Sequence, residues 1–183
     1  MDAQQAARLQ ELWDQHEIRT LLATYCHGCD RGDKALMASV YAAQSWDDHG
    51  PNKCDGKVFA DLIIDQSLAT TRVVSHQLGQ SLVTVDGDVA GAETYFIATM
   101  LYPPRDGADK EAINQLGGRY VDRLVREGGQ WRIRERLCVR EWSVSRTVDD
   151  DWLAKAGFIE TARGQADVSW QALGMAPMAQ AAT

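Results

Sequence analysis

The chain of 183 residues is long enough for one domain with a single core, and its 45% hydrophobic content is ordinary for a globular protein. A formal net charge of −7 disfavours nucleic acid or an anionic membrane as a partner, since both attract surfaces of clustered Lys and Arg. No stretch approaches the roughly 20 apolar residues of a membrane helix, and the first residues lack the pattern of a signal peptide. We therefore expect a cytoplasmic protein whose four cysteines are free thiols.

The first half of the chain carries the pattern of three helices. Apolar residues recur at spacings of three to five over residues 3–29, which predicts one long amphipathic helix that ends at Gly28 and the polar run 30–33. A second helix is expected over 34–43 and a third over 57–69. Between them, 45–56 is rich in turn residues and predicts a loop with one short strand at most.

After the third helix the period changes to that of strands. β-branched and alternating residues predict two long antiparallel hairpins, which turn at Asp86-Gly87 and at Glu127-Gly128-Gly129. Their strands are expected over 73–85, 89–102, 118–126 and 130–146. Helices followed by a four-strand meander indicate an α+β fold rather than alternating βαβ units.

This pattern assigns residues 1–146 to one domain and residues 147–183 to a C-terminal extension. The run Asp149-Asp150-Asp151 before Trp152 predicts the start of a short helix in the extension. The composition from Thr161 onward is small and polar around Trp170, so we expect this segment to pack on the domain or on a neighbouring subunit.

The motif Cys26-His27-Gly28-Cys29 matches the CxxC pattern of redox pairs and of half a zinc site. A redox pair needs a helix that begins at its first cysteine, whereas the predicted helix ends here. Zinc needs about four ligands, and the sequence has no second CxxC or HxxxH, although His49 and Cys54 could be recruited. Packing on the helix face is the favoured interpretation, so no metal is expected.

Tyr25, Asp30 and His76 are the main candidates for acid–base chemistry. Strand alternation puts His76 on an apolar face, where it is either a core histidine or a site residue. An imidazole can act as a base, a carboxylate can fix its tautomer, and a phenol can polarise a carbonyl or a leaving group. Alternatively, Asp30 is a turn residue and Tyr25 a core aromatic. The two are about 140° apart around a helix, so both reach one cavity only if the helix unwinds near Gly28.

Four further residues are weaker candidates, for substrate binding. Tyr95 lies on a predicted strand, Arg119 follows two glycines, and His49 lies in the turn-rich stretch. Solvated or salt-bridged roles are simpler for these three. Trp142 most simply fills a core or an interface, although dense tryptophan would also suit a pocket for a ring-bearing ligand.

Several short motifs, together with the order of the predicted elements, resemble the SnoaL-like branch of the NTF2-like superfamily. The motifs are Tyr25-x4-Asp30, Ser75-His76-x2-Gly79, Val85-Asp86-Gly87-Asp88, Gly118-Arg119-Tyr120-x-Asp122-Arg123 and Trp131-Arg132-Ile133. The resemblance covers about residues 9–146 and implies a cone in which a curved antiparallel sheet wraps on the N-terminal helices around a cavity.

Members such as scytalone dehydratase, bile acid 7α-dehydratase and hexachlorocyclohexane dehydrochlorinase use an Asp–His pair in that cavity, often with a tyrosine. The resemblance therefore implies that Asp30 and His76 form the pair and that Tyr25 is the tyrosine. One departure concerns the proton relay, because Ala98 stands where the bile acid enzyme has a further acidic residue.

The resemblance implies a lyase that needs no cofactor and acts on a hydrophobic, aromatic or polycyclic, hydroxylated small molecule. Dehydration and related eliminations are expected, with formaldehyde-releasing carbon–carbon cleavage among them. A homodimer or homotrimer is expected. Two alternatives remain open: an isomerase or polyketide-cyclase-type enzyme with the same cavity, and a non-catalytic partner domain such as the small subunit of a ring-hydroxylating oxygenase.

Overall fold

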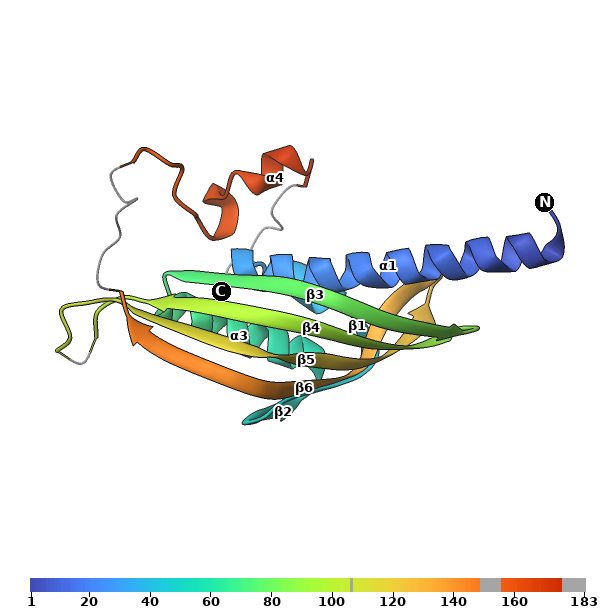
Figure 1. Cartoon of the computed structure of the whole chain (residues 1–183), viewed down its shortest axis with the longest axis horizontal. Coiled ribbons are helices and arrows are strands. Elements are labelled where there is room, and N and C mark those ends of the chain that lie inside the picture. The colour runs from blue at the N-terminus through green and yellow to red at the C-terminus, as the bar shows by residue number, and fades with distance from the viewer. Residues whose placement is uncertain (106, 149–155, 176–183) are drawn as a thin grey trace.

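The computed structural model describes residues 1–105, 107–148 and 156–175, and it has the expected α+β architecture (Figure 1). Helices come first and a curved sheet follows, with two short helical turns in the C-terminal segment. The elements are α1 (Ala3–Arg31), α2 (Lys34–Ser39), β1 (Tyr41–His49), β2 (Asn52–Cys54), α3 (Gly56–Thr70), β3 (Val73–Asp86), β4 (Val89–Tyr102), β5 (Ala112–Glu127), β6 (Gln130–Thr147), the 3₁₀ turn η1 (Gly164–Ala166) and α4 (Ser169–Ala172).

The six strands form one open sheet in the order β2-β1-β6-β5-β4-β3. The meander from β3 to β6 is antiparallel, which confirms the two predicted hairpins. The sheet as a whole is mixed, because β1 pairs with β6 in parallel. The parallel pair joins strands about 90 residues apart in the sequence, so no local hairpin pattern could have revealed it.

The core lies between the sheet and the helices α1 and α3. Ile18, Leu22 and Tyr25 of α1 are buried there, as are Phe59 and Ile64 of α3. Apolar residues earlier in α1, such as Leu9, Leu12 and Trp13, are exposed. Figure 1 shows why: the N-terminal part of α1 extends past the end of the sheet, so no strand covers it.

Helix α1 continues through Gly28 without unwinding, so the expectation that Gly28 helps to end it was wrong. The helix ends at Arg31, two residues past the predicted residue 29 and within the polar run 30–33 that was expected to end it, and Gly32 follows in the left-handed conformation with φ 73°. Gly28 has another use: a Cβ at this position would lie 2.7 Å from the backbone nitrogen of Met37. The glycine therefore allows α2 to pack closely against α1 and does not loosen the helix.

The second helix is shorter than predicted, and the stretch after it contains more strand. Helix α2 ends at Ser39, and Tyr41 already begins β1. Asp48 and His49, expected in a loop, therefore lie on β1. Strand β5 also begins at Ala112, before the expected residue 118, and continues past a register shift at Gly117-Gly118. The short helix predicted after Asp149 lies outside the described residues. Among the described helices, none is both long enough and apolar enough to cross a membrane.

Candidate active site

A small cavity of about 160 Å³ lies between α1, α3 and the helix-covered face of the sheet. Its wall is mainly apolar and aromatic, with Phe59, Phe96 and Tyr120 among the lining residues. Phe96 and Tyr120 stack on each other with ring centroids 4.2 Å apart, so the aromatic part of the wall is built from packed rings. A larger and more open hollow of about 360 Å³ lies beside the N-terminal half of α1, but no carboxylate among the described residues contacts His16, its histidine.

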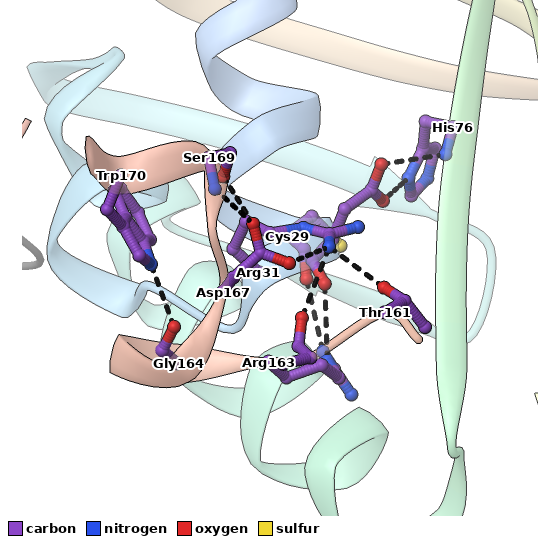
Figure 2. Close-up of polar contacts among 11 residues, drawn as sticks. Cys29, Arg31, His76, Thr161, Arg163, Gly164, Asp167, Ser169 and Trp170 are labelled. Atoms are coloured by element: carbon purple, nitrogen blue, oxygen red, sulfur yellow. Dashed lines mark hydrogen bonds and ion pairs between the residues drawn. The ribbon is translucent and has the colours of Figure 1, made fainter. Parts of the chain in front are cut away.

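His76 and Asp30 are in direct contact at the wall of the cavity. The ring Nδ1 of His76 lies 2.6 Å from one carboxylate oxygen of Asp30, and the backbone N–H of His76 donates to the other oxygen at 2.9 Å. Both side chains are largely buried, with exposures of 10% and 12%. Because a carboxylate accepts, Nδ1 carries the proton in the neutral ring, and Nε2 is left with the lone pair. Figure 2 shows His76 on β3 facing the end of α1.

Tyr25 lines the same cavity, although α1 does not unwind. Tyr25 and Asp30 point about 140° apart around the helix, which would keep them from one cavity only if Asp30 itself had to enter it. In the structure Asp30 lies behind His76 and only the imidazole lines the wall, so the carboxylate and the phenol can leave the helix in different directions.

A buried ion pair lies beneath the phenol rings. Arg136 donates to both carboxylate oxygens of Asp122 at 2.7 and 2.8 Å, and both side chains are fully buried. The guanidinium packs against the rings of Tyr25 and Tyr120 at 4.1 and 4.2 Å from their centroids. Burial raises the pKa of both phenols well above the usual value, even though the charge of Arg136 opposes this shift. The two phenols therefore remain protonated and can donate hydrogen bonds.

His49 is the other predicted residue that lines the cavity, and it too is bound to a carboxylate. Its Nδ1 contacts Asp47, which is fully buried and also accepts a hydrogen bond from the hydroxyl of Tyr41. The His49 ring stacks on Phe59 with centroids 4.3 Å apart. The cavity wall thus contains two histidines, each paired with an aspartate through Nδ1.

The remaining three predicted binding residues lie away from this cavity. Along β4 and β5, Phe96 and Tyr120 face the helices, so their neighbours Tyr95 and Arg119 face the opposite side of the sheet. Arg119 pairs there with Glu93 and Glu141 at 2.7 and 2.8 Å. Tyr95 and Trp142 line a separate hollow on that side.

The CxxC cysteines lie within α1 and are buried, free thiols. Burial raises the pKa of Cys29 to about 12, so this thiol stays protonated at neutral pH. Possible ligand atoms of Cys29, Asp30 and His76 do lie within 4.8 Å of one another. A metal would need thiolate and would compete with the hydrogen bonds that already hold the pair, so the donor set fits an Asp–His pair better than a metal site. Ala98 lies opposite His76 on β4, so no acidic side chain occupies that position.

The C-terminal segment covers the end of α1 that carries Asp30 (Figure 2). Arg163 donates to the backbone oxygens of Cys29 and Asp30 at 3.1 and 3.3 Å, and to the Ser67 hydroxyl at 2.7 Å. Arg31 forms an ion pair with Asp167 at 2.7 Å. The segment thereby satisfies carbonyl groups at the end of the helix beside the Asp–His pair.

Four residues of this site were missed in the sequence: Asp47, Asp122, Arg136 and Arg163. For Asp47 a signal existed, because Asp47 and His49 are two residues apart and share a face if this stretch is a strand. Asp122 and Arg136 lie opposite each other on β5 and β6. Their burial depends on the pairing of the strands and on the curvature of the sheet, and neither can be predicted from the local sequence around Asp122 or Arg136. Nothing in the sequence around Arg163 points to α1.

Comparisons with known proteins agree with this architecture. The SnoaL-like domain family matches residues 10–137, and no curated protein matches the chain. A solved structure of a type 2 hexachlorocyclohexane dehydrochlorinase has a TM-score of 0.66 at 14% identity, covering 80% of this chain and 97% of that one. A candidate scytalone dehydratase from Novosphingobium aromaticivorans DSM 12444 has a TM-score of 0.65 at 18% identity, covering 75% and 90%.

A third structure, an NTF2-like protein with a cystatin-like fold from Novosphingobium aromaticivorans, has a TM-score of 0.56 at 25% identity. It covers 85% of this chain and 96% of its own. Such low identities establish the fold, and the family match extends over more than half of the sequence. The chain therefore belongs to the SnoaL-like family and has an NTF2-like fold.

Proposed function

We propose that the protein is a lyase that needs no cofactor and eliminates a leaving group from a hydrophobic, hydroxylated aromatic small molecule. The observation that carries this proposal is the pairing of His76 with Asp30 at the wall of a largely apolar cavity. The names of the two related structures, a dehydrochlorinase and a candidate dehydratase, support elimination as the reaction class.

In the proposed reaction His76 is the base. Asp30 keeps the proton of the neutral ring on Nδ1, so the lone pair of Nε2 takes a proton from carbon. The electron pair of the broken C–H bond forms the new double bond, and the bond from the neighbouring carbon to the leaving group breaks. Tyr25, protonated because burial raises its pKa, donates a hydrogen bond to the leaving hydroxyl or to a developing oxyanion.

The size of the cavity narrows the substrate class. A cavity of about 160 Å³ is close to the roughly 150 Å³ that accommodates a benzene molecule, and it is smaller than most pockets for drug-sized ligands. We infer that one aromatic ring enters the cavity and packs against Phe96 and Tyr120. A polycyclic substrate would have to leave its other rings outside the mouth.

The test is product analysis by mass spectrometry with single-ring hydroxylated and halogenated compounds, in buffer with a chelator and no added cofactor. Elimination gives a product that has lost water, halide or formaldehyde, whereas a product of unchanged mass would identify an isomerase or cyclase instead. General acid–base assistance typically contributes about 10²–10⁴-fold, so His76→Ala and Asp30→Asn should lose most of the activity.

The matched control is His16→Ala, because His16 is exposed and lies outside the cavity. Circular dichroism and thermal unfolding establish that each variant is folded before its activity is compared. Wild-type turnover in both His76→Ala and Asp30→Asn would rule out the proposed chemistry.

A further inference from the structure

We propose that His49, held by Asp47, is a second catalytic group in this cavity and donates a proton to the leaving oxygen while His76 removes the proton from carbon. The proposal rests on the elimination chemistry above and assigns the acid that such a reaction needs when the leaving group is hydroxide. It begins from the buried contacts of Asp47.

Asp47 has the surroundings of a positioning residue. It is fully buried, and each of its two oxygens has a partner: His49 Nδ1 contacts one, and the hydroxyl of Tyr41 donates to the other. Tyr41 is itself fixed, because its ring packs over Gly56, where a Cβ would lie 2.1 Å from the ring. A carboxylate held on both oxygens fixes the orientation of the imidazole.

The second pair repeats the arrangement of the first. Asp30 also uses both oxygens, one for the ring Nδ1 of His76 and one for its backbone N–H. Among the described residues, no protein group forms a hydrogen bond with Nε2 of either ring. Both histidines line the same cavity, so each can present Nε2 to one bound molecule.

The two imidazoles lie on different sides of the cavity. Ring contacts run from His76 to Phe96 at 6.4 Å, from Phe96 to Tyr120 at 4.2 Å, and from Tyr120 to His49 at 6.0 Å between centroids. His76 comes from β3 and His49 from β1, near opposite edges of the sheet. An aromatic ring that packs on Phe96 and Tyr120 would therefore lie between them.

The position of Tyr25 is the reason for assigning the leaving group to His49. Tyr25 contacts Tyr41 and Tyr120 with centroids 6.2 and 5.7 Å away, so the phenol that would bind the leaving oxygen lies toward the His49 side. The side of His76 includes Val74, Ala98 and the protonated thiol of Cys29. A leaving hydroxyl that binds Tyr25 is then nearer to His49, and the carbon acid is nearer to His76.

The step balances with both rings taking part. The C–H proton moves to Nε2 of His76, the C–H electron pair becomes the double bond, and the C–O bond breaks. The proton on Nε2 of protonated His49 moves to the departing oxygen, so the leaving group is water. In net terms His49 has lost one proton and His76 has gained one, and exchange with solvent restores both rings.

The test compares two leaving groups on one carbon skeleton: a β-hydroxy phenyl ketone and the matching β-chloro ketone, which give the same enone. Hydroxide needs a proton to leave, and chloride does not. We expect His49→Gln to lower kcat on the hydroxy ketone about 10²–10³-fold and on the chloro ketone less than about threefold. His76→Gln should lower kcat on both. Equal losses on the two ketones, or no loss on either, in folded His49→Gln would overturn the assignment.

A measurement that needs no substrate separates the two proposals. In ¹⁵N-histidine spectra at mildly alkaline pH, His49 and His76 should both carry their proton on Nδ1, with exposed His16 as the reference. Asp47→Asn, or Tyr41→Phe if the first variant is unstable, should alter the His49 tautomer population without altering that of His76. An unchanged His49 signal in both variants refutes the second pair, whereas a missing Nδ1 proton on His76 refutes the first pair alone. If the wild type converts neither ketone, the elimination proposal fails for this substrate class, and the acid role of His49 falls with it.

Discussion

Arg163→Met offers a sharp test of how the C-terminal segment contributes to the site. The guanidinium forms two shorter hydrogen bonds, to Ser67 at 2.7 Å and to the Cys29 carbonyl at 3.1 Å, and longer ones to Asp30 and Thr71. It also places a positive charge at the C-terminal end of α1. Methionine keeps much of the apolar volume of the side chain and removes every one of these interactions.

The expected loss follows from these contacts. A hydrogen bond from a charged donor contributes about 1.5–3 kcal/mol when buried, and less here because Arg163 is only half buried. A cation at a helix C-terminus adds about 0.3–1 kcal/mol. Cys29 keeps its other bond, from the backbone N–H of Gly32 at 3.2 Å, which limits the damage. We expect Arg163→Met to lower the free energy of unfolding by about 2–4 kcal/mol.

Urea unfolding followed by circular dichroism measures this loss. With a slope of about 2 kcal/mol per molar urea, the midpoint should fall by about 1–2 M. Arg134→Met is the matched control, because Arg134 is exposed on β6 and should leave the midpoint unchanged. Arg163→Lys should fall between the two, since it keeps the charge but not the fork of donors. A midpoint for Arg163→Met within about 0.25 M of the wild type would refute the reasoning.

Three further predictions concern packing, acid stability and thiol chemistry. Gly28→Ala should destabilise the fold by about 1–3 kcal/mol in the same urea assay, because its Cβ would lie 2.7 Å from the Met37 backbone nitrogen. Burial alone would raise the pKa of Asp14, but hydrogen bonds from arginine, tryptophan and glutamine side chains outweigh burial and lower it. Asp14 therefore stabilises the fold above its ordinary pKa of 3.8 and loses this effect as pH falls through the lower folded value, so Asp14→Asn should flatten the acid limb of a stability–pH curve. Burial raises the pKa of Cys29 and Cys138 to about 12. At pH 8 both thiols should therefore react with a disulfide reagent about 10³-fold more slowly in the native protein than in the protein unfolded by guanidinium. Equal reaction rates in the two states would contradict this prediction.

The sequence allowed much of the fold to be predicted, because its strongest signals are local. The two hairpins follow from alternation and from their glycine turns, and β4 begins and ends where the pattern predicts. The boundary between α2 and β1 was missed, because the short apolar run around Tyr41 suits a helix as well as a strand. Pairing with β6 decides in favour of the strand, and that contact is remote in sequence.

In the candidate site, too, local features could be predicted and long-range contacts could not. Strand alternation predicts that the His76 side chain points inward, but its pairing with Asp30 depends on how the last turn of α1 packs against β3. The placement of Tyr95 and Arg119 was within reach, since each is next to an aromatic residue that must face the other way. Strand alternation does not show which of the two faces of the sheet packs against the helices.

The electrostatics of the cavity support the proposal that its two histidines carry the acid–base chemistry. Tyr25 and Tyr120 keep their protons because burial raises their pKa, and the thiol of Cys138 behaves in the same way. The charge of Arg136 is matched by Asp122 in a fully buried pair. The phenols can then only donate, and the ion pair is a fixed part of the wall. The two imidazoles that line the cavity, those of His76 and His49, come from different strands, and we propose that proton transfer takes place at these rings.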